Sequence, residues 1–257
     1  MLKLENIHKV FNPGTINEKV ALDGLNLHLQ PGDFCTVIGG NGAGKSTMLN
    51  AVAGVFALDG GRITIDGDDV TNLPEYKRAA YLGRVFQDPM TGTAATMQIE
   101  ENLALAARRG KKRGLRIGIT PSEREEYRER LKVLGLGLED RLTARVGLLS
   151  GGQRQALTLL MATLKKPKVL LLDEHTAALD PKTADVIMEL TERVVREKKL
   201  TAMMVTHNLR YAVEYGSRLV MLDKGQIVLD KSGEEKASMR VDDILHIFNA
   251  ISIECGN

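Results

Sequence analysis

The chain has 257 residues, 43% of them hydrophobic and 26% charged, which suffices for one large domain or one domain with an inserted lobe. Its net charge of +2, from 35 basic and 33 acidic residues, excludes a strong overall positive field that would attract nucleic acid or an anionic membrane. Cys35 and Cys255 give no disulfide framework or metal-ligand spacing, which favours a reducing compartment. With no recognisable signal peptide or membrane span, we expect a cytoplasmic protein that reaches a membrane only through a partner.

The N-terminal third of the chain predicts strands and one helix. Apolar and polar residues alternate in "LKLENIHKVF" and "ALDGLNLHL", as in strands with one buried face. "FCTVIG" is apolar at successive positions, which is typical of a strand buried on both faces. A glycine loop and a helix follow it. The expected strands lie within 2–11, 21–29, 34–39, 60–70 and 81–89, and the helix spans 45–55.

Residues 90 to about 165 change character, because apolar residues recur at helical spacing and no convincing strand occurs there. We interpret this stretch as an inserted helical lobe. Buried strands then return on either side of another helix, and a β-hairpin turning at Lys224-Gly225 precedes a short helical tail. The expected helices are 97–110, 121–136, 151–164 and 184–199, the strands 167–174 and 200–208, and the hairpin 218–232.

"GGNGAGKS", residues 39–46, matches the pattern G-x-x-x-x-G-K-[ST] between a predicted strand and a predicted helix, which is the context of a phosphate loop. Small residues let backbone N–H groups wrap phosphates, Lys45 would reach the β- and γ-phosphates, and the Ser46 hydroxyl would ligate Mg²⁺. The alternative is a plain glycine-rich turn. The residues expected to hold the nucleotide here are Gly39, Asn41, Gly42, Ala43, Gly44, Lys45, Ser46 and Thr47.

"VLLLDE", residues 169–174, is a buried strand that ends in two carboxylates. Asp173 at the strand tip is placed to hold Mg²⁺, directly or through water. Glu174 comes one residue later, where it could polarise the attacking water as a general base. The alternative is a strand capped by solvated acids.

The order of GGNGAGKST, Gln87, LSGGQRQ, VLLLDE, ALD and VTHN resembles the nucleotide-binding subunit of ATP-binding-cassette (ABC) proteins over nearly the whole chain. The resemblance implies an α/β P-loop NTPase fold of the ABC ATPase type, with a mixed sheet core, an N-terminal antiparallel β subdomain and an inserted helical subdomain. It places the core and β subdomain in 1–87 and 166–257, and the helical subdomain with the signature motif in 88–165.

In this family two cassettes pack head to tail, and each ATP lies between the phosphate loop of one and the signature of the other. The resemblance therefore implies that Ser150, Gly151, Gly152 and Gln153 bind the γ-phosphate of the ATP held by a second subunit, most simply an identical copy. Asp180 in "ALD" would lie at the seam between the subunits.

Three further roles rest on the resemblance. His207 would touch the γ-phosphate, although a lone histidine after a strand is more often structural. Gln87 would contact Mg²⁺ and the attacking water at the hinge into the helical lobe. Phe11 would stack on adenine, with core or loop packing as the alternative. His175 occupies a position where many relatives have proline; it either adds a titratable ring beside Glu174 or is a tolerated loop substitution.

The resemblance favours the ATPase subunit of a bacterial importer for a small solute such as an amino acid, attached to the inner face of the membrane. Its expected partners are permease subunits and, indirectly, a substrate-binding protein. The segment 88–106 would receive a permease helix, with Met90, Met97 and Ile99 as candidate contacts. The alternatives are a cassette acting on DNA or ribosomes and a phosphoryl-transfer kinase, which LSGGQ opposes. The basic run 108–114 lacks aromatic neighbours, which favours a solvated loop over nucleic-acid binding.

Overall fold

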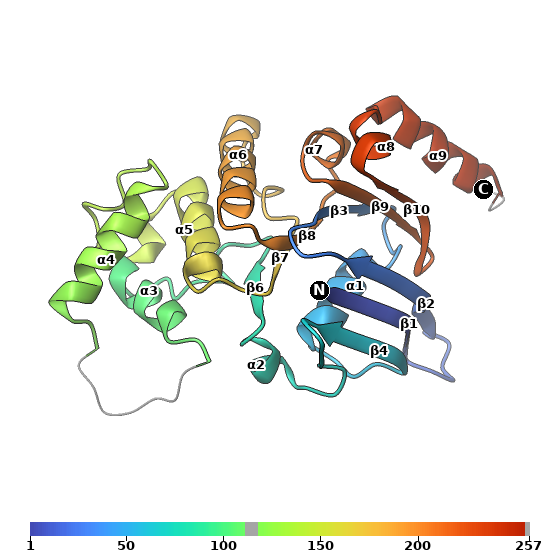
Figure 1. The fold of residues 1–257 in the computed structure, drawn as a ribbon, viewed down its shortest axis with the longest axis horizontal. Helices are drawn as coiled ribbons and strands as arrows, with labels where there is room; N and C mark the ends of the chain where they lie inside the picture. Colours follow the sequence, from blue (N-terminus) through green and yellow to red (C-terminus); the bar gives the residue numbers. More distant parts are fainter. Residues whose placement is uncertain (111–117, 255–257) are drawn as a thin grey trace.

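A computed structural model describes residues 1–110 and 118–254, the last four by their backbone alone. Its centre is a six-stranded sheet in the order β10-β9-β3-β8-β7-β6, in which only the β9–β10 pair is antiparallel (Figure 1). The apolar run predicted for strand β3 is buried at every position, as expected for a strand covered on both faces. The strands are β3 (Phe34–Gly39), β6 (Leu82–Val85), β7 (Val169–Asp173), β8 (Thr201–Val205), β9 (Arg218–Asp223) and β10 (Gln226–Ser232).

A second, antiparallel sheet in the order β2-β1-β4-β5 packs beside the first. Its alternating apolar residues turn inward onto helix α1, which also covers one face of the central sheet, so the three elements share one hydrophobic cluster. The N-terminal antiparallel subdomain implied by the resemblance is therefore present. The elements are β1 (Leu2–Phe11), β2 (Lys19–Leu29), β4 (Gly60–Ile65), β5 (Asp68–Asp69) and α1 (Lys45–Ala53).

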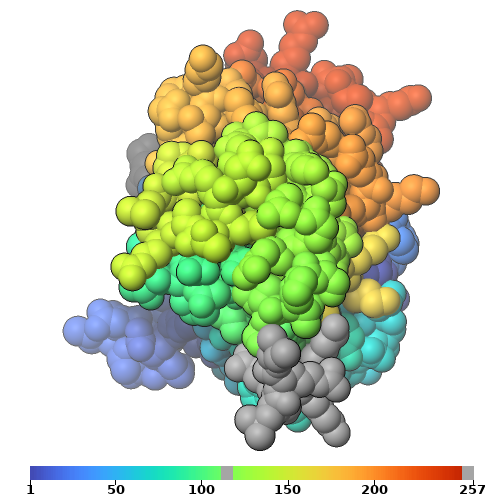
Figure 2. Space-filling model, turned by 90° about the vertical axis from the view of Figure 1, so that its left-hand side faces the viewer, coloured from blue at the N-terminus to red at the C-terminus, as the bar shows by residue number. Residues whose placement is uncertain are grey.

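The opposite face of the central sheet is covered by α5 and α6, and the helices α3 and α4 lie beyond α5 (Figure 1). Leu170 and Leu172 of β7 share a buried cluster with Leu103 of α3 and Leu131 of α4, so the helical segment joins the sheet through a continuous core. Figure 2 shows the outer face that this segment forms. The elements are α3 (Ile99–Ala107), α4 (Pro121–Lys132), η1 (Val146–Leu148), α5 (Gly151–Leu164) and α6 (Pro181–Glu197).

The expected elements are confirmed, with changes at their ends. The predicted strand 81–89 stops at Val85, because the chain turns at Asp88, whose carboxylate accepts from the Met90 N–H. The helix expected to reach Leu136 stops at Lys132, shortly before Gly135 with its left-handed φ of 67°. The hairpin turns at Lys224-Gly225 as predicted. Four helices complete the described chain: α2 (Glu75–Arg78), α7 (Leu209–Glu214), α8 (Gly233–Ala237) and α9 (Val241–Glu254).

Residues 88–165 hold the helices α3, α4 and α5, and the division of the chain into subdomains at Gln87 and residue 166 stays a prediction. Among the described residues, no helix combines the length and apolarity needed to cross a membrane. Arg108 of the basic run pairs with Glu123 and Arg109 donates to the Ala162 carbonyl, whereas positions 111–114 lie outside the described residues. Cys255 also lies outside them. Cys35 is buried, and burial raises its pKa to about 12.

Candidate functional site

The loop between β3 and α1 is held in a conformation that needs glycine at two positions. Gly39 has a φ of 151°, and a Cβ built there would lie 2.3 Å from the Leu222 carbonyl oxygen. Gly44 has a φ of 104°, and its Cβ would lie 2.5 Å from the Ala21 carbonyl oxygen. These contacts leave no room for a side chain. The strand–loop–helix context predicted for a phosphate loop is therefore present.

Lys45 begins α1 and folds back over this loop. Its ammonium donates to the carbonyl oxygens of Gly39 at 2.7 Å and Gly40 at 2.9 Å, and only 5% of the residue is exposed. Burial lowers the pKa of Lys45, while the nearby Glu174 carboxylate raises it. The loop thus holds the Lys45 ammonium against its own carbonyl oxygens, and the oxygens of a bound anion could take the place of these carbonyl oxygens.

A cavity of about 160 Å³ lies beside the loop, at the carboxyl ends of β3, β7 and β8. Ligands of open α/β sheets bind at this edge. Lys19 and Ala21 of β2 also line the cavity, and the sequence analysis missed both because they belong to the other sheet. The described residues lining it are Lys19, Ala21, Asn41, Gly42, Ala43, Gly44, Lys45, Ser46, Thr47, Glu174 and His207.

Glu174 and His207 meet in the cavity that Lys45 also lines. His207 Nε2 lies 2.7 Å from Glu174 Oε1, and the side chain of Glu174 is 14% exposed against 48% for His207. Glu174 has a left-handed φ of 44°, and its N–H donates to the Val205 carbonyl at the end of β8. The structure therefore brings together two of the predicted site residues that lie far apart in the sequence, in a cavity that they share with the phosphate loop.

Asp173 contacts an arginine, and its role as a magnesium ligand stays a prediction. Its Oδ2 lies 3.3 Å from Nη2 of Arg84 on β6, and the same nitrogen donates to Asn50 Oδ1 at 2.6 Å. No motif in the sequence assigns a role to Arg84. Its neighbours in the short strand β6 carry no signal of a partner on β7.

The oxygen-bearing residues at this edge fit a magnesium ion that arrives with phosphates. Within the described part of the chain, no group of three or more His, Cys, Asp or Glu residues could hold a metal alone. Mg²⁺ is usually bound by one or two protein oxygens, substrate phosphates and water. Ser46 lines the cavity and Asp173 ends the adjacent strand. Gln87, the third predicted ligand, is exposed and lies outside the described cavity lining.

The signature segment forms an exposed helix start away from the cavity. Ser150 caps α5, since its hydroxyl accepts from the Gln153 N–H at 3.2 Å and the Gln153 side chain accepts from the Ser150 N–H at 3.2 Å. A Cβ at Gly152 would lie 2.4 Å from Thr183 Cγ2, so the segment packs tightly against the start of α6. Neither Ser150 nor Gly151 is buried.

Asp180, predicted at the seam between subunits, caps α6. Its carboxylate accepts from the Thr183 N–H at 3.1 Å. Hydrogen bonding by the Thr183 side chain and by this N–H lowers the pKa of Asp180. Since Gly152 also approaches Thr183, the signature and Asp180 are neighbours in one chain. Neither is among the described residues lining the cavity.

Phe11 packs within its own chain. Its ring meets Phe56 edge to face, with centroids 5.5 Å apart and planes at 83°, and the Lys9 ammonium lies 5.6 Å from its centre. In the chain alone, Phe11 therefore packs against its own chain, which was the alternative to stacking on adenine. The contact with adenine stays a prediction. Ile99 is wholly buried, so its suggested contact with a permease is wrong, whereas Met90 is exposed.

His175 is a packing residue beside the site. It is 2% exposed, its Nε2 lies 3.1 Å from Thr191 Oγ1 on α6, and burial lowers its pKa to about 4. Thr191 donates its own proton to the Ile187 carbonyl, so His175 is the donor in the contact between them. The ring is therefore neutral at physiological pH, which favours the loop-packing alternative over a titrating group next to Glu174.

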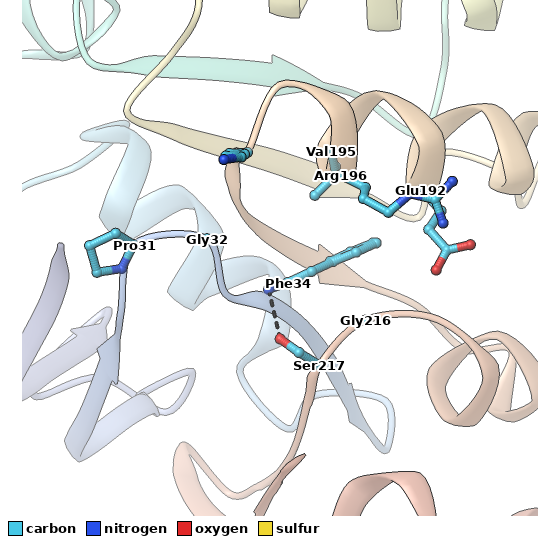
Figure 3. A pocket seen from close by; sticks show the side chains of 9 residues that line it. Pro31, Gly32, Phe34, Glu192, Val195, Arg196, Gly216 and Ser217 are labelled. Atoms are coloured by element: carbon cyan, nitrogen blue, oxygen red, sulfur yellow. Dashed lines mark hydrogen bonds between the residues drawn. The ribbon is translucent and has the colours of Figure 1, made fainter.

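A larger groove of about 610 Å³ lies at the opposite, amino end of β3 (Figure 3). Phe34 lines it, and its N–H donates to Ser217 Oγ at 3.1 Å. Glu192 and Arg196 of α6 bring opposite charges to the same wall. The carboxyl edge of the sheet, with its glycine loop and convergent polar groups, is the better candidate site despite its smaller volume.

Comparisons with known proteins show the family to which the chain belongs. The profile described as "ABC transporter" matches residues 22–177. The chain is 46% identical to the tyrosine transport ATP-binding protein of Clostridioides difficile, over 96% of this chain and 98% of that protein. It is 34% identical to the spermidine/putrescine import ATP-binding protein PotA of Haemophilus influenzae, over 91% of this chain and 59% of PotA.

Among solved structures, the chain resembles the ATP-binding cassette MJ0796 in a dimeric post-hydrolysis state bound to ADP and Pi. The TM-score is 0.76 at 30% identity, over 90% of this chain and 98% of that one. The fold implied by the sequence is confirmed. The chain is an ATP-binding cassette of the ABC transporter family.

Proposed function

We propose that this chain is the ATP-hydrolysing subunit of a transporter that imports an amino acid, with tyrosine as the first solute to test. The observation that carries the proposal is the cavity that Lys45 lines together with the Glu174–His207 pair. The importer assignment is supported by the likeness to a tyrosine transport subunit and to a polyamine import subunit. These likenesses do not favour a cassette that acts on DNA or ribosomes.

Within the cavity, the side chains divide the work of phosphoanhydride hydrolysis. Lys45 exchanges its two carbonyl contacts for the β- and γ-phosphates. Glu174 accepts a proton from the attacking water, and His207, whose Nε2 lies 2.7 Å from that carboxylate, turns this nitrogen to the γ-phosphate and donates to it when ATP is bound. Magnesium, held with Ser46, Asp173 and Gln87, would neutralise phosphate charge. A positioned general base contributes about 10²–10⁴ in rate, so most of the acceleration must come from such fixed cations and donors.

A second copy would complete the site. The exposed N-terminus of α5 offers backbone N–H groups and the Ser150 hydroxyl to an anion, yet it lies outside the cavity of its own chain. We assign it to the ATP bound by a partner cassette, in keeping with the dimeric state of MJ0796. In this arrangement Asp180, next to Gly152, lies at the seam. The active unit is thus a dimer, most simply of identical chains.

The partners and location follow from the same assignment. A permease would dock on the segment after Gln87, where Met90 is exposed, and would hold the subunit at the inner face of the membrane. A binding protein would deliver the solute on the other side. The direct test is reconstitution of the subunit with its permease in vesicles. ATP hydrolysis should rise several-fold when tyrosine and the binding protein are added, and hydrolysis unchanged by every amino acid would overturn the solute class.

Mixed dimers test the shared site. We expect Ser150→Arg to block the pocket whose phosphate loop lies on the other subunit, because the long arginine side chain fills the exposed helix start. Ser150→Arg and Lys45→Ala can be placed together in one copy of the dimer or separately in its two copies. The two arrangements leave different numbers of intact pockets, depending on which chain supplies the signature.

If the signature acts in trans, the copy that carries both changes spoils two different pockets, whereas separate copies spoil the same pocket and leave one working. Hydrolysis near half of the parental rate is therefore expected from separate copies, and near-complete loss from the doubly changed copy. The reverse result would reject the assignment to a partner's ATP.

A further inference from the structure

Arg84 contacts the predicted magnesium ligand Asp173, and the proposed mechanism gives the arginine no role. Its side chain is 15% exposed on β6. Nη2 reaches Asn50 Oδ1 at 2.6 Å and Asp173 Oδ2 at 3.3 Å. The guanidinium lies over the Phe86 ring, 4.6 Å from its centre. In the described part of the chain, the buried Nε has no hydrogen-bond partner. The arginine is thus enclosed and aimed at the carboxylate.

Each of the three groups that Arg84 touches is an expected magnesium ligand or lies near one in the chain. Asn50 lies four residues after Ser46 on α1, and residues four apart share one face of a helix. Asp173 is itself an expected ligand. Phe86 directly precedes Gln87. One guanidinium therefore connects the elements that carry the Ser46 hydroxyl, the Asp173 carboxylate and the Gln87 amide.

We propose that Arg84 is a positioning residue that fixes the Asp173 carboxylate against α1 and, by its charge, keeps the site from binding a divalent cation before nucleotide arrives. A guanidinium is planar and permanently charged, so it holds one carboxylate oxygen in a defined direction. Among the contacts of the described residues, Oδ2 is occupied by Arg84, which leaves Oδ1 as the acceptor without a hydrogen bond. The cation beside the carboxylate repels a divalent ion, and the negative phosphates of a bound nucleotide overcome that repulsion. The inference rests on the proposed function, because it concerns the same nucleotide site.

Two classes of substitution separate charge from packing. Arg84→Met and Arg84→Gln remove the charge and keep much of the stem, whereas Arg84→Lys keeps the charge and loses the planar fork. Arg62→Met is a matched control, since Arg62 is an exposed arginine paired with Asp69 on the antiparallel sheet. Thermal unfolding of each variant establishes that it is folded.

The deciding measurement is the affinity for Mn²⁺ alone, followed by electron paramagnetic resonance without nucleotide. We expect Arg84→Met and Arg84→Gln to bind Mn²⁺ at least about fivefold more tightly than the parent, as removal of a nearby positive charge requires even after solvent screening. Arg84→Lys and Arg62→Met should stay within about twofold of the parent. In hydrolysis, all three Arg84 variants should lose kcat more than they change KM for ATP.

Equal or weaker Mn²⁺ binding by the two neutral variants would overturn the charge role. Hydrolysis by Arg84→Lys at the parental rate would overturn the positioning role. Failure of the proposed transport function would be distinguished from both readouts. Mn²⁺ binding needs no turnover. For hydrolysis, a parent without ATPase activity would be recognised before any variant was compared.

Discussion

Acidification should destabilise this chain through the buried ring of His175. The imidazole is 2% exposed, and burial lowers its pKa from 6.5 to about 4 in the folded chain. An unfolded chain therefore takes up a proton on His175 at a higher pH than the folded chain does. The stability that the neutral ring contributes is complete above pH 6.5 and is lost as the pH falls towards 4.

The size of this loss follows from the two pKa values. Each unit between them corresponds to about 1.4 kcal/mol, so the full difference is roughly 3 kcal/mol, and roughly 2 kcal/mol of it is lost between pH 7 and pH 4.5. His175→Gln is the matching perturbation. Its amide can still donate to Thr191 Oγ1, the partner that lies 3.1 Å from the histidine nitrogen, and it does not titrate.

The assay is urea unfolding of the parent and His175→Gln at several pH values. The parent's free energy of unfolding, relative to that of the variant, should fall by roughly 2 kcal/mol from pH 7 to pH 4.5. All other titrating groups are common to both proteins and cancel in the difference. Parallel curves for the two proteins would refute the reasoning, because they would mean that the ring is protonated equally in both states.

Two further changes probe the site itself. Glu174→Gln should slow hydrolysis by about 10²–10⁴, because the amide cannot take the proton of the attacking water. Binding of a fluorescent ATP analogue should stay within about threefold of the parent, and a closed dimer should accumulate on a sizing column. Hydrolysis at the parental rate would remove Glu174 from its role. Gly44→Ala should lower the free energy of unfolding by roughly 3 kcal/mol, because its φ of 104° and the Ala21 oxygen 2.5 Å from its Cβ oppose any side chain. Gly40→Ala, which has open space at that position, is the matched control and should cost less than about 1 kcal/mol; equal losses in the two variants would contradict the steric argument.

Local sequence patterns predicted the parts of the fold that depend on local chemistry. The strands β3, β7 and β8 are apolar at successive positions because they are covered on both faces, and that burial is legible in the sequence. The turn at Lys224-Gly225 was predictable from its glycine, because glycine adopts a positive φ readily. The φ of Gly225 is 80°, and that of Lys224 is also positive, at 45°. The helices α2 and α7 were missed, because four and six residues are too few to show a helical period.

Contacts between distant segments could not be predicted in this way. Arg84 meets Asn50 and Asp173, which lie 34 and 89 positions away, and nothing in a short strand announces such partners. The burial of His175 depends on helix α6 closing over the loop, so its sequence neighbours do not reveal a neutral ring. The family resemblance predicted that Glu174 and His207 act at the same nucleotide site. The contribution of Lys19, which comes from the other sheet, was visible only in the structure.

The close approach of α5 to strand β6 has a mechanical consequence. A Cβ at Gly83 would lie 2.5 Å from the Ala162 carbonyl oxygen, so the last turn of α5 rests directly on the strand backbone and can serve as a fulcrum. From Ala162 the helix extends about 18 Å to its capped start at Ser150. A tilt of about ten degrees at the fulcrum would swing that tip by roughly 3 Å. Small rotations near Gln87, four residues beyond Gly83, would thus be magnified into displacements large enough to open or close a joint with a neighbouring molecule.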